Sequence, residues 1–220
     1  MILYKIIPVF FVLFISISDS YGEELFSPEI VFNRMIGVYK KLNSYSDEGV
    51  RTIFFYKNKK FHHKDVQEFE TYYMSPNTFK FKWIDYYSGS GPEENFLENI
   101  DGEINLKKWN KKPIKYDSLN KAISRVTGTT GRAIYWLPRF FLKDVFCPDF
   151  TKIKLKYIGD SNVLGRNAYM IEIIYKSGDS EVVWIDKGDY TLVKIKNKSQ
   201  LLAYEIVNEI MYKNVHVGKN

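Results

Sequence analysis

The sequence predicts an α+β fold with a large antiparallel sheet. Residues 28–43 carry apolar side chains at helical spacing, whereas most of the chain from Asp47 onward has the two-residue period of strands. Residues 118–143 lose that period. Of the 220 residues, 45% are hydrophobic and 26% charged, as in folded globular proteins. This length and composition favour one domain, with a helix first and the sheet after it.

A single amphipathic helix is expected at the start of the domain. Ser27 is a suitable N-cap, Pro28 fits the first helical position, and Glu29 places an acid in the first turn. An apolar stripe follows at i, i+4, i+7 and i+11: Val31, Met35, Val38 and Leu42. We therefore predict a helix from residue 28 to near residue 43, with this stripe buried.

About ten strands are expected to follow, in two groups. Asp101-Gly102 is a strong signal for a tight hairpin within the first group. Short strands separated by turn residues predict antiparallel pairing between neighbours. The first group spans residues 49–57, 66–74, 78–87, 95–100 and 103–109, and the second spans 152–159, 167–176, 181–186, 190–197 and 201–213.

Several of these strands alternate between apolar residues and lysine. Phe79, Phe81 and Trp83 should face one way, and Lys80 and Lys82 the other. The sheet is therefore expected to have one apolar face and one cationic face. The same pattern sets Ile153, Leu155 and Tyr157 against Lys152, Lys154 and Lys156, and Val193 and Ile195 against Lys194 and Lys196.

Residues 118–143 are predicted to form two short helices over the apolar face. Ser118 can cap the first helix, which should end at Gly128. Pro138 should break or kink the second segment, because proline has no amide hydrogen. A flexible stretch, residues 128–131 (GTTG), is expected to join the two. The second segment has apolar residues at helical spacing: Ala133, Leu137, Phe140 and Phe141.

The first 22 residues have the layout of a secretory signal peptide. Lys5 precedes an apolar run at residues 6–17, and Ser20-Tyr21-Gly22 places small residues before a cut at Glu23. The run is shorter than the roughly 20 residues that a membrane span needs. We expect residues 1–22 to be removed on export and residues 23–220 to form one domain; a buried N-terminal helix is the alternative.

The sequence carries no motif for catalysis, a metal or a cofactor. Cys147 is the single cysteine, so an internal disulfide is excluded. His62-His63 has metal-like character, but neighbouring residues on a strand point to opposite faces, which favours a solvated hairpin tip. Export and the lack of a nucleic-acid motif argue against a nucleic-acid partner. We expect a protein that is not an enzyme and holds no metal or cofactor.

The apolar face has two interpretations. It is either a filled core beneath the helices or the wall of a cavity, covered by short helices that act as a lid. Each buried methylene contributes about 0.8 kcal/mol, so a cavity wall of this kind holds an acyl chain with little directional chemistry.

Four short motifs resemble the LolA-like superfamily of periplasmic lipoprotein carriers, which includes LolB-like and uncharacterised exported proteins. The first is the exit of the helix, residues 39–45 (YKKLNSY), and the second is a proline-then-aromatic strand, residues 75–83 (SPNTFKFKW). The third is Ile100-Asp101-Gly102 with Trp109 and Pro113 downstream, and the fourth is the late strand at residues 183–187 (VWIDK).

The resemblance implies a strongly curved, unclosed half-barrel around an apolar cavity closed by lid helices. It implies a non-catalytic, monomeric carrier or binding protein for lipids or acylated (lipoprotein) cargo, in outer-membrane lipid or lipoprotein transport in the periplasm of a Gram-negative bacterium. It also allows a transient membrane-surface or membrane-protein partner. Where the carriers have an arginine before the proline, which ties the closed lid, this chain has Ser75.

The alternative is a structural or regulatory interaction domain of the same fold, whose lysine-rich face binds an anionic membrane or protein partner. For the carrier, the expected ligand-binding residues of the cavity are Phe79, Phe81, Trp83, Ile153, Leu155, Tyr157, Tyr169, Ile171, Ile173 and Trp184. The expected lid residues are Ala133, Trp136, Leu137, Phe140 and Phe141.

Overall fold

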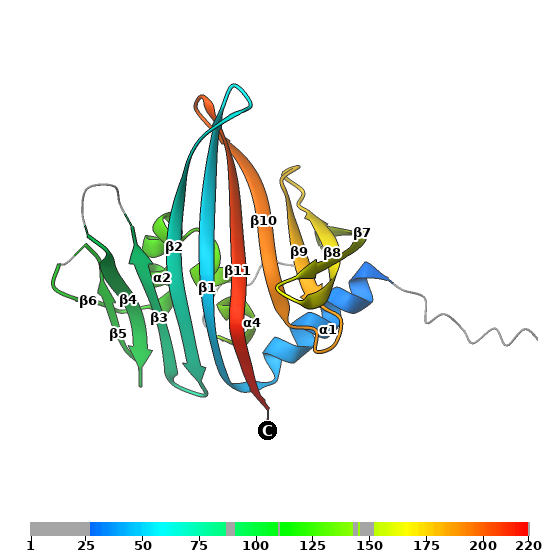
Figure 1. Cartoon of the computed structure of the whole chain (residues 1–220). Coiled ribbons are helices and arrows are strands. Elements are labelled where there is room, and N and C mark those ends of the chain that lie inside the picture. Colours follow the sequence, from blue (N-terminus) through cyan, green and yellow to red (C-terminus); the bar gives the residue numbers. More distant parts are fainter. Residues whose placement is uncertain (1–26, 87–90, 110, 143–144, 146–151, 220) are drawn as a thin grey trace, which may run out of the picture.

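The computed structural model describes residues 27–86, 91–109, 111–142, 145 and 152–219. These residues form one eleven-stranded sheet in which every neighbouring pair is antiparallel, in the order β6-β5-β4-β3-β2-β1-β11-β10-β9-β8-β7. β6 and β7 are the two edges, so the sheet does not close. Figure 1 shows the helices gathered on one side of the sheet, which we call the concave face. The predicted unclosed antiparallel sheet is confirmed.

The helices are α1 (Pro28–Lys40), α2 (Leu119–Thr130), α3 (Ala133–Trp136) and α4 (Pro138–Phe141). The strands are β1 (Leu42–Lys57), β2 (Lys60–Met74), β3 (Thr78–Asp85), β4 (Glu93–Ile100), β5 (Glu103–Lys107), β6 (Ile114–Tyr116), β7 (Lys154–Val163), β8 (Arg166–Ile174), β9 (Ser180–Asp186), β10 (Leu192–Leu201) and β11 (Tyr204–Lys219).

Helix α1 begins as the sequence predicts, but it buries a different stripe. The Ser27 side chain accepts a hydrogen bond from the Glu29 amide at 3.2 Å. The buried residues of the helix are Val31, Phe32, Met35 and Tyr39, whereas Val38 is half-buried. The prediction of Val38 as a core position is wrong, because the larger Phe32 and Tyr39 turn toward the sheet in its place. Leu42 is buried, but it belongs to β1.

The hairpin predicted at Asp101-Gly102 is confirmed. Both residues have positive φ angles, 52° and 88°, as a tight two-residue turn between β4 and β5 requires. The central strands are longer than predicted, since β1 and β11 each run for 16 residues. The short strand β6 was not predicted.

The flexible linker predicted at residues 128–131 is wrong. Helix α2 continues through Gly128 to Thr130, where the Thr130 hydroxyl donates back to the Val126 carbonyl at 3.0 Å. Gly131 alone turns the chain, with a φ of 58°. The break at Pro138 is confirmed, because α3 ends at Trp136 and α4 begins at Pro138.

The predicted alternation fails at one point in β10. A register shift between Leu192 and Lys194 leaves Leu192 and Ile195 in the main core but turns Val193 to the opposite, convex face. There Val193 packs with Ala168 and Trp184 in a separate small cluster. The expectations that Val193 and Trp184 share the concave apolar face are therefore wrong.

The convex face is mixed in charge rather than cationic. Lys82 pairs with Glu94 at 3.3 Å, and both Lys194 and Lys196 pair with Glu209, at 2.8 and 2.9 Å. The two-residue period correctly predicted that these lysines point to the convex face. The neighbouring strands, however, place carboxylates beside them. The predicted cationic face is therefore wrong.

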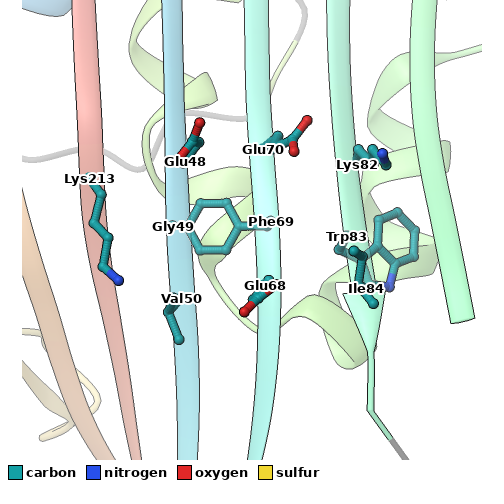
Figure 2. Close-up of a pocket in the computed structure, with 10 residues that line it drawn as sticks. All are labelled: Glu48, Gly49, Val50, Glu68, Phe69, Glu70, Lys82, Trp83, Ile84 and Lys213. Carbon is teal, nitrogen blue, oxygen red and sulfur yellow. The ribbon is translucent and has the colours of Figure 1, made fainter. Parts of the chain in front are cut away.

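Close packing across β1 and β2 depends on Gly49. Figure 2 shows the Phe69 ring lying against Gly49, at the base of a pocket of about 230 Å³ that is lined by both acidic and basic side chains. A Cβ atom at Gly49 would lie 2.0 Å from Cζ of Phe69, and Phe69 is buried and stacked on Phe81 with ring centroids 5.5 Å apart. The Phe69 ring therefore fills the space that a larger residue 49 would need.

We expect Gly49→Ala to lower the free energy of unfolding by about 1–3 kcal/mol, because Phe69 must leave its packed position. The matched control is Gly37→Ala in α1, where a Cβ would meet nothing within 4 Å. That substitution should stabilise the protein by about 0.5–1 kcal/mol, since alanine favours the helix. Urea unfolding measures both; equal stability of Gly49→Ala and the wild type would contradict this packing.

Candidate functional site

The candidate site is the concave face of the sheet with the helices that cover it. Of the predicted cavity residues, five are fully buried in the main core: Phe79, Phe81, Trp83, Ile171 and Ile173. Ile153, Leu155 and Tyr169 are half-buried against this core. Tyr157, on edge strand β7, is 37% exposed and donates its hydroxyl to Asp160, while Trp184 lies on the convex face. The structure thus brings eight of the ten residues to one apolar surface.

All five predicted lid residues lie in the same core, on α3 and α4 or between them. Phe141 packs on Tyr73 and Tyr45, with ring centroids 4.7 and 5.4 Å apart. Phe140 stacks on Tyr39 of α1 at 6.2 Å and meets Trp136 edge-on at 5.4 Å. These two short helices therefore pack directly on the concave face, and their aromatic side chains occupy it.

A buried carboxylate ties α3 to the sheet. Glu181 on β9 is 1% exposed and forms an ion pair with Arg132. It also accepts hydrogen bonds from the Trp136 indole at 3.0 Å and from the Tyr175 hydroxyl. Desolvation and the nearby Glu181 charge raise the pKa of Tyr175, so this hydroxyl stays a donor. Such charge-assisted bonds are stronger than neutral ones and hold α3 in one position.

A second tie holds the C-terminal end of α2. Arg51 on β1 donates to the Thr129 carbonyl, an acceptor that the end of the helix leaves without an intrahelical partner, and to Asn208 Oδ1 at 2.9 Å. Lys108 donates to the Thr129 hydroxyl at 2.8 Å. A Cβ at Gly131 would lie 2.7 Å from Cζ of Arg51, so glycine permits this close approach.

These polar ties were not predicted from the sequence. Arg51 and Glu181 occupy inward positions of their strands, in phase with Gly49 and with Val183. A charged residue at an inward strand position predicts a buried polar partner, because burial of an unpaired charge is costly. This signal was present in the sequence. Their partners, Thr129 and Arg132, could not have been assigned without the fold.

A basic groove of about 910 Å³ borders the lid where α1, α4 and the ends of β1 and β2 meet. Its charged lining residues, Arg34, Lys40 and Lys41, are all cationic, whereas Tyr73 and Phe141 belong to the apolar core. The groove therefore joins positive charge to the buried aromatic contacts of the lid. Its full lining is Arg34, Gly37, Val38, Lys40, Lys41, Leu42, Asn43, Tyr73, Ser75, Phe141 and Tyr190.

One buried acid lies below the lid aromatics. Asp47 is 4% exposed and accepts hydrogen bonds from the Tyr45 hydroxyl and from the Thr71 amide at 3.1 Å. Burial raises the pKa of Asp47 to about 7, although these hydrogen bonds act in the opposite direction. Burial also raises the pKa of Tyr45 well above its usual value.

Other predicted features lie elsewhere. His62 and His63 are exposed near the turn of the β1–β2 hairpin, with Nδ1 atoms 2.6 Å apart, and the described residues contain no group of three or more metal-ligating side chains. Ser75 lies in the basic groove. Cys147 and residues 1–22 lie outside the described residues. Among the described helices, none is long and apolar enough to cross a bilayer.

No family model and no curated protein matches this chain. Among solved structures, the MucA/MucB complex of Pseudomonas aeruginosa matches at 14% identity and a TM-score of 0.46, over 87% of this chain and 57% of that one. A LolA superfamily protein from Nitrosomonas europaea matches at 10% identity and a TM-score of 0.33, over 89% and 95% of the two chains.

A domain provisionally described as an outer-membrane lipoprotein-sorting protein, from Vibrio parahaemolyticus, matches at 14% identity and a TM-score of 0.34, over 86% and 91% of the chains. The neighbours thus include the superfamily that the sequence motifs resemble, at low identity. This chain spans little more than half of the MucB-containing chains.

Asp47 should make stability depend on pH. An unfolded aspartate titrates near pH 3.9, so between about pH 4 and 7 the folded protein binds one proton more than the unfolded chain. The contribution of Asp47 to stability is therefore present below about pH 4 and is lost as the pH rises to about 7. Asp47→Asn stays neutral, so its stability relative to the wild type should rise over this window.

Urea unfolding at several pH values checks this expectation. Asp160→Asn is the control: Lys187, 2.6 Å away, holds the pKa of that exposed carboxyl below its usual value. The stability of the control relative to the wild type should not rise between about pH 4 and 7. If the difference in free energy of unfolding between Asp47→Asn and the wild type stays constant with pH, Asp47 does not titrate in this range.

Proposed function

We propose that this protein is an exported, non-catalytic carrier or binding protein for lipids or acylated protein cargo. The acyl chains bind on the concave face, in the space that the lid aromatics fill when the lid is closed. The anionic head of the cargo binds at the basic groove.

The nature of the lid carries this proposal. Helices α3 and α4 have four residues each, too few to be stable alone, so they persist because Trp136, Phe140 and Phe141 pack on the concave face. An acyl chain offers that face the same kind of apolar contact, at about 0.8 kcal/mol for each buried methylene. Cargo can therefore replace the lid side chains without exposing the sheet to water.

The groove supports an amphipathic cargo. Arg34, Lys40 and Lys41 line it with positive charge, and Phe141 connects it to the core. A ligand that extends from the groove past Phe141 would place an anionic group beside these cations and its apolar chain on the concave face. Cations that line a recess raise the local concentration of anionic ligands.

Location and partners follow from the sequence. Residues 1–22 are proposed to be a signal peptide, which would deliver residues 23–220 to the periplasm of a Gram-negative bacterium as one monomeric domain. A role in outer-membrane lipid or lipoprotein transport fits this location. The alternative, an interaction domain that binds through a lysine-rich sheet face, has less support because Lys82, Lys194 and Lys196 are paired with glutamates.

Weakening the tie at Glu181 should improve ligand binding. Glu181→Gln removes the charge that pairs with Arg132 but keeps an acceptor for Trp136. If the open state is the one that binds, a larger open population raises the apparent affinity. We expect a fluorescent hexadecanoic acid to bind the variant about tenfold more tightly, which corresponds to about 1.4 kcal/mol.

Fluorescence titration and thermal unfolding on the same samples provide the test. The matched control is Glu103→Gln, which breaks an exposed pair with Lys115 between β5 and β6 and should leave the affinity unchanged. If the wild type and Glu181→Gln are both folded and neither binds the fatty acid, the carrier function is wrong. Binding of equal strength by the two would exclude Glu181 as a restraint on opening.

A further inference from the structure

Two hairpins project together from one end of the sheet. The β1–β2 turn at Asn58-Lys59 and the β10–β11 turn near Leu202 lie side by side, because β1 pairs with β11 up to Lys57 and Tyr204. Figure 1 shows both turns above the helices, at the top of the longest strands. We call residues 54–65 and 198–206 the double-hairpin tip.

The tip exposes large apolar side chains. Phe61 is 58% exposed, Leu201 57% and Leu202 90%. Leu202 also has a φ of 54°, a left-handed conformation that favours glycine or asparagine over leucine. Leu164 in the β7–β8 turn has the same φ and is also exposed, so what sets Leu202 apart is its place beside Leu201 at the end of the sheet that also carries Phe61. The three side chains lie at the same end of the sheet, on two hairpins that are neighbours through the β1–β11 pairing.

Lysines surround these apolar groups. The tip contains five lysines, Lys57, Lys59, Lys60, Lys64 and Lys198, but only two carboxylates, Asp65 and Glu205. Lys198 pairs with Glu205 across the β10–β11 hairpin at 3.5 Å. The other four lysines still outnumber the remaining carboxylate, so the tip keeps an excess of positive charge. Tyr204 lies below the turn, with Lys57 Nζ 5.9 Å from its ring centroid.

We infer that the double-hairpin tip docks on an anionic phospholipid bilayer and inserts Leu201, Leu202 and Phe61 among the headgroups. The projecting apolar side chains match the apolar boundary of the bilayer, and the lysines match its negative surface potential. Two narrow turns offer little of the flat area that a stable protein partner needs, which favours the bilayer. The inference does not depend on cargo, so it goes beyond the proposed function.

Docking would also orient the lid. Arg51, which holds the end of α2, lies on β1 six residues before Lys57. At about 3.3 Å per strand residue, this places the α2 tie roughly 20 Å from the turn. A tip on the bilayer would therefore hold the end of α2 nearer to the membrane than α4, whose Phe141 packs on Tyr45 near the other end of β1.

The test is sedimentation of the exported protein with two kinds of vesicles, phosphatidylcholine mixed with phosphatidylglycerol and phosphatidylcholine alone. We expect binding to the anionic vesicles, weakened by salt because exposed charges are screened. Leu202→Asp should reduce that binding at least about tenfold. Lys59→Glu with Lys60→Glu should reduce it similarly, by removing the attraction to the negative surface.

The chain offers a close control for Leu202. Leu164, in the β7–β8 turn, is 56% exposed and has the same φ of 54°. Leu164→Asp should leave vesicle binding unchanged. In Leu202→Trp, anionic vesicles should shift the added tryptophan fluorescence to the blue, a sign of insertion rather than of charge attraction alone.

Circular dichroism of each variant checks that it is folded. Absence of vesicle binding by the folded wild type, or equal loss in Leu202→Asp and Leu164→Asp, would overturn the inference. The fatty-acid titration uses no vesicles, so failure of docking and failure of the carrier function are separate results.

Discussion

A curved sheet that does not close has an apolar face that another part of the chain must cover. In this protein α1 and residues 119–142 cover it, with both aliphatic and aromatic side chains. Because α3 and α4 are too short to be stable alone, their structure depends on this packing. The position of α3 and α4 therefore depends on the concave face, and in the proposed carrier a ligand for that face would compete with their side chains.

The ties of the lid are unevenly distributed. Arg51 and Glu181 hold the end of α2 and the start of α3 through charged hydrogen bonds. At α4, Phe140 and Phe141 meet Tyr39, Tyr45 and Tyr73 through ring contacts beside the basic groove. Aromatic contacts are less directional than charged hydrogen bonds, so in the proposed carrier an amphipathic ligand would enter at α4, with its head at the groove.

Much of the fold follows from local patterns. The two-residue period located ten of the eleven strands, and Ser27, Asp101-Gly102 and Pro138 marked a helix start, a turn and a break. Each of these signals acts within a few residues, which is why it can be read without tertiary contacts.

The errors arose where one strand meets another. The shift at Leu192 turns Val193 outward, and neither it nor the glutamates that neutralise the convex lysines can be read from a single strand. The ties to Arg51 and Glu181 likewise join residues 78 and 49 positions apart. Long-range pairs depend on register, and register follows from the whole sheet.

The central claim is that an acyl chain binds on the concave face, under the lid. Quenching of single-tryptophan variants by a brominated fatty acid tests it most directly, because Trp83 and Trp184 lie on opposite faces of the sheet. With the other tryptophans replaced by phenylalanine, we predict strong quenching of Trp83 and little of Trp184. Binding under the lid would be contradicted if the fatty acid quenched Trp184 alone, or if it quenched neither tryptophan while both variants were folded.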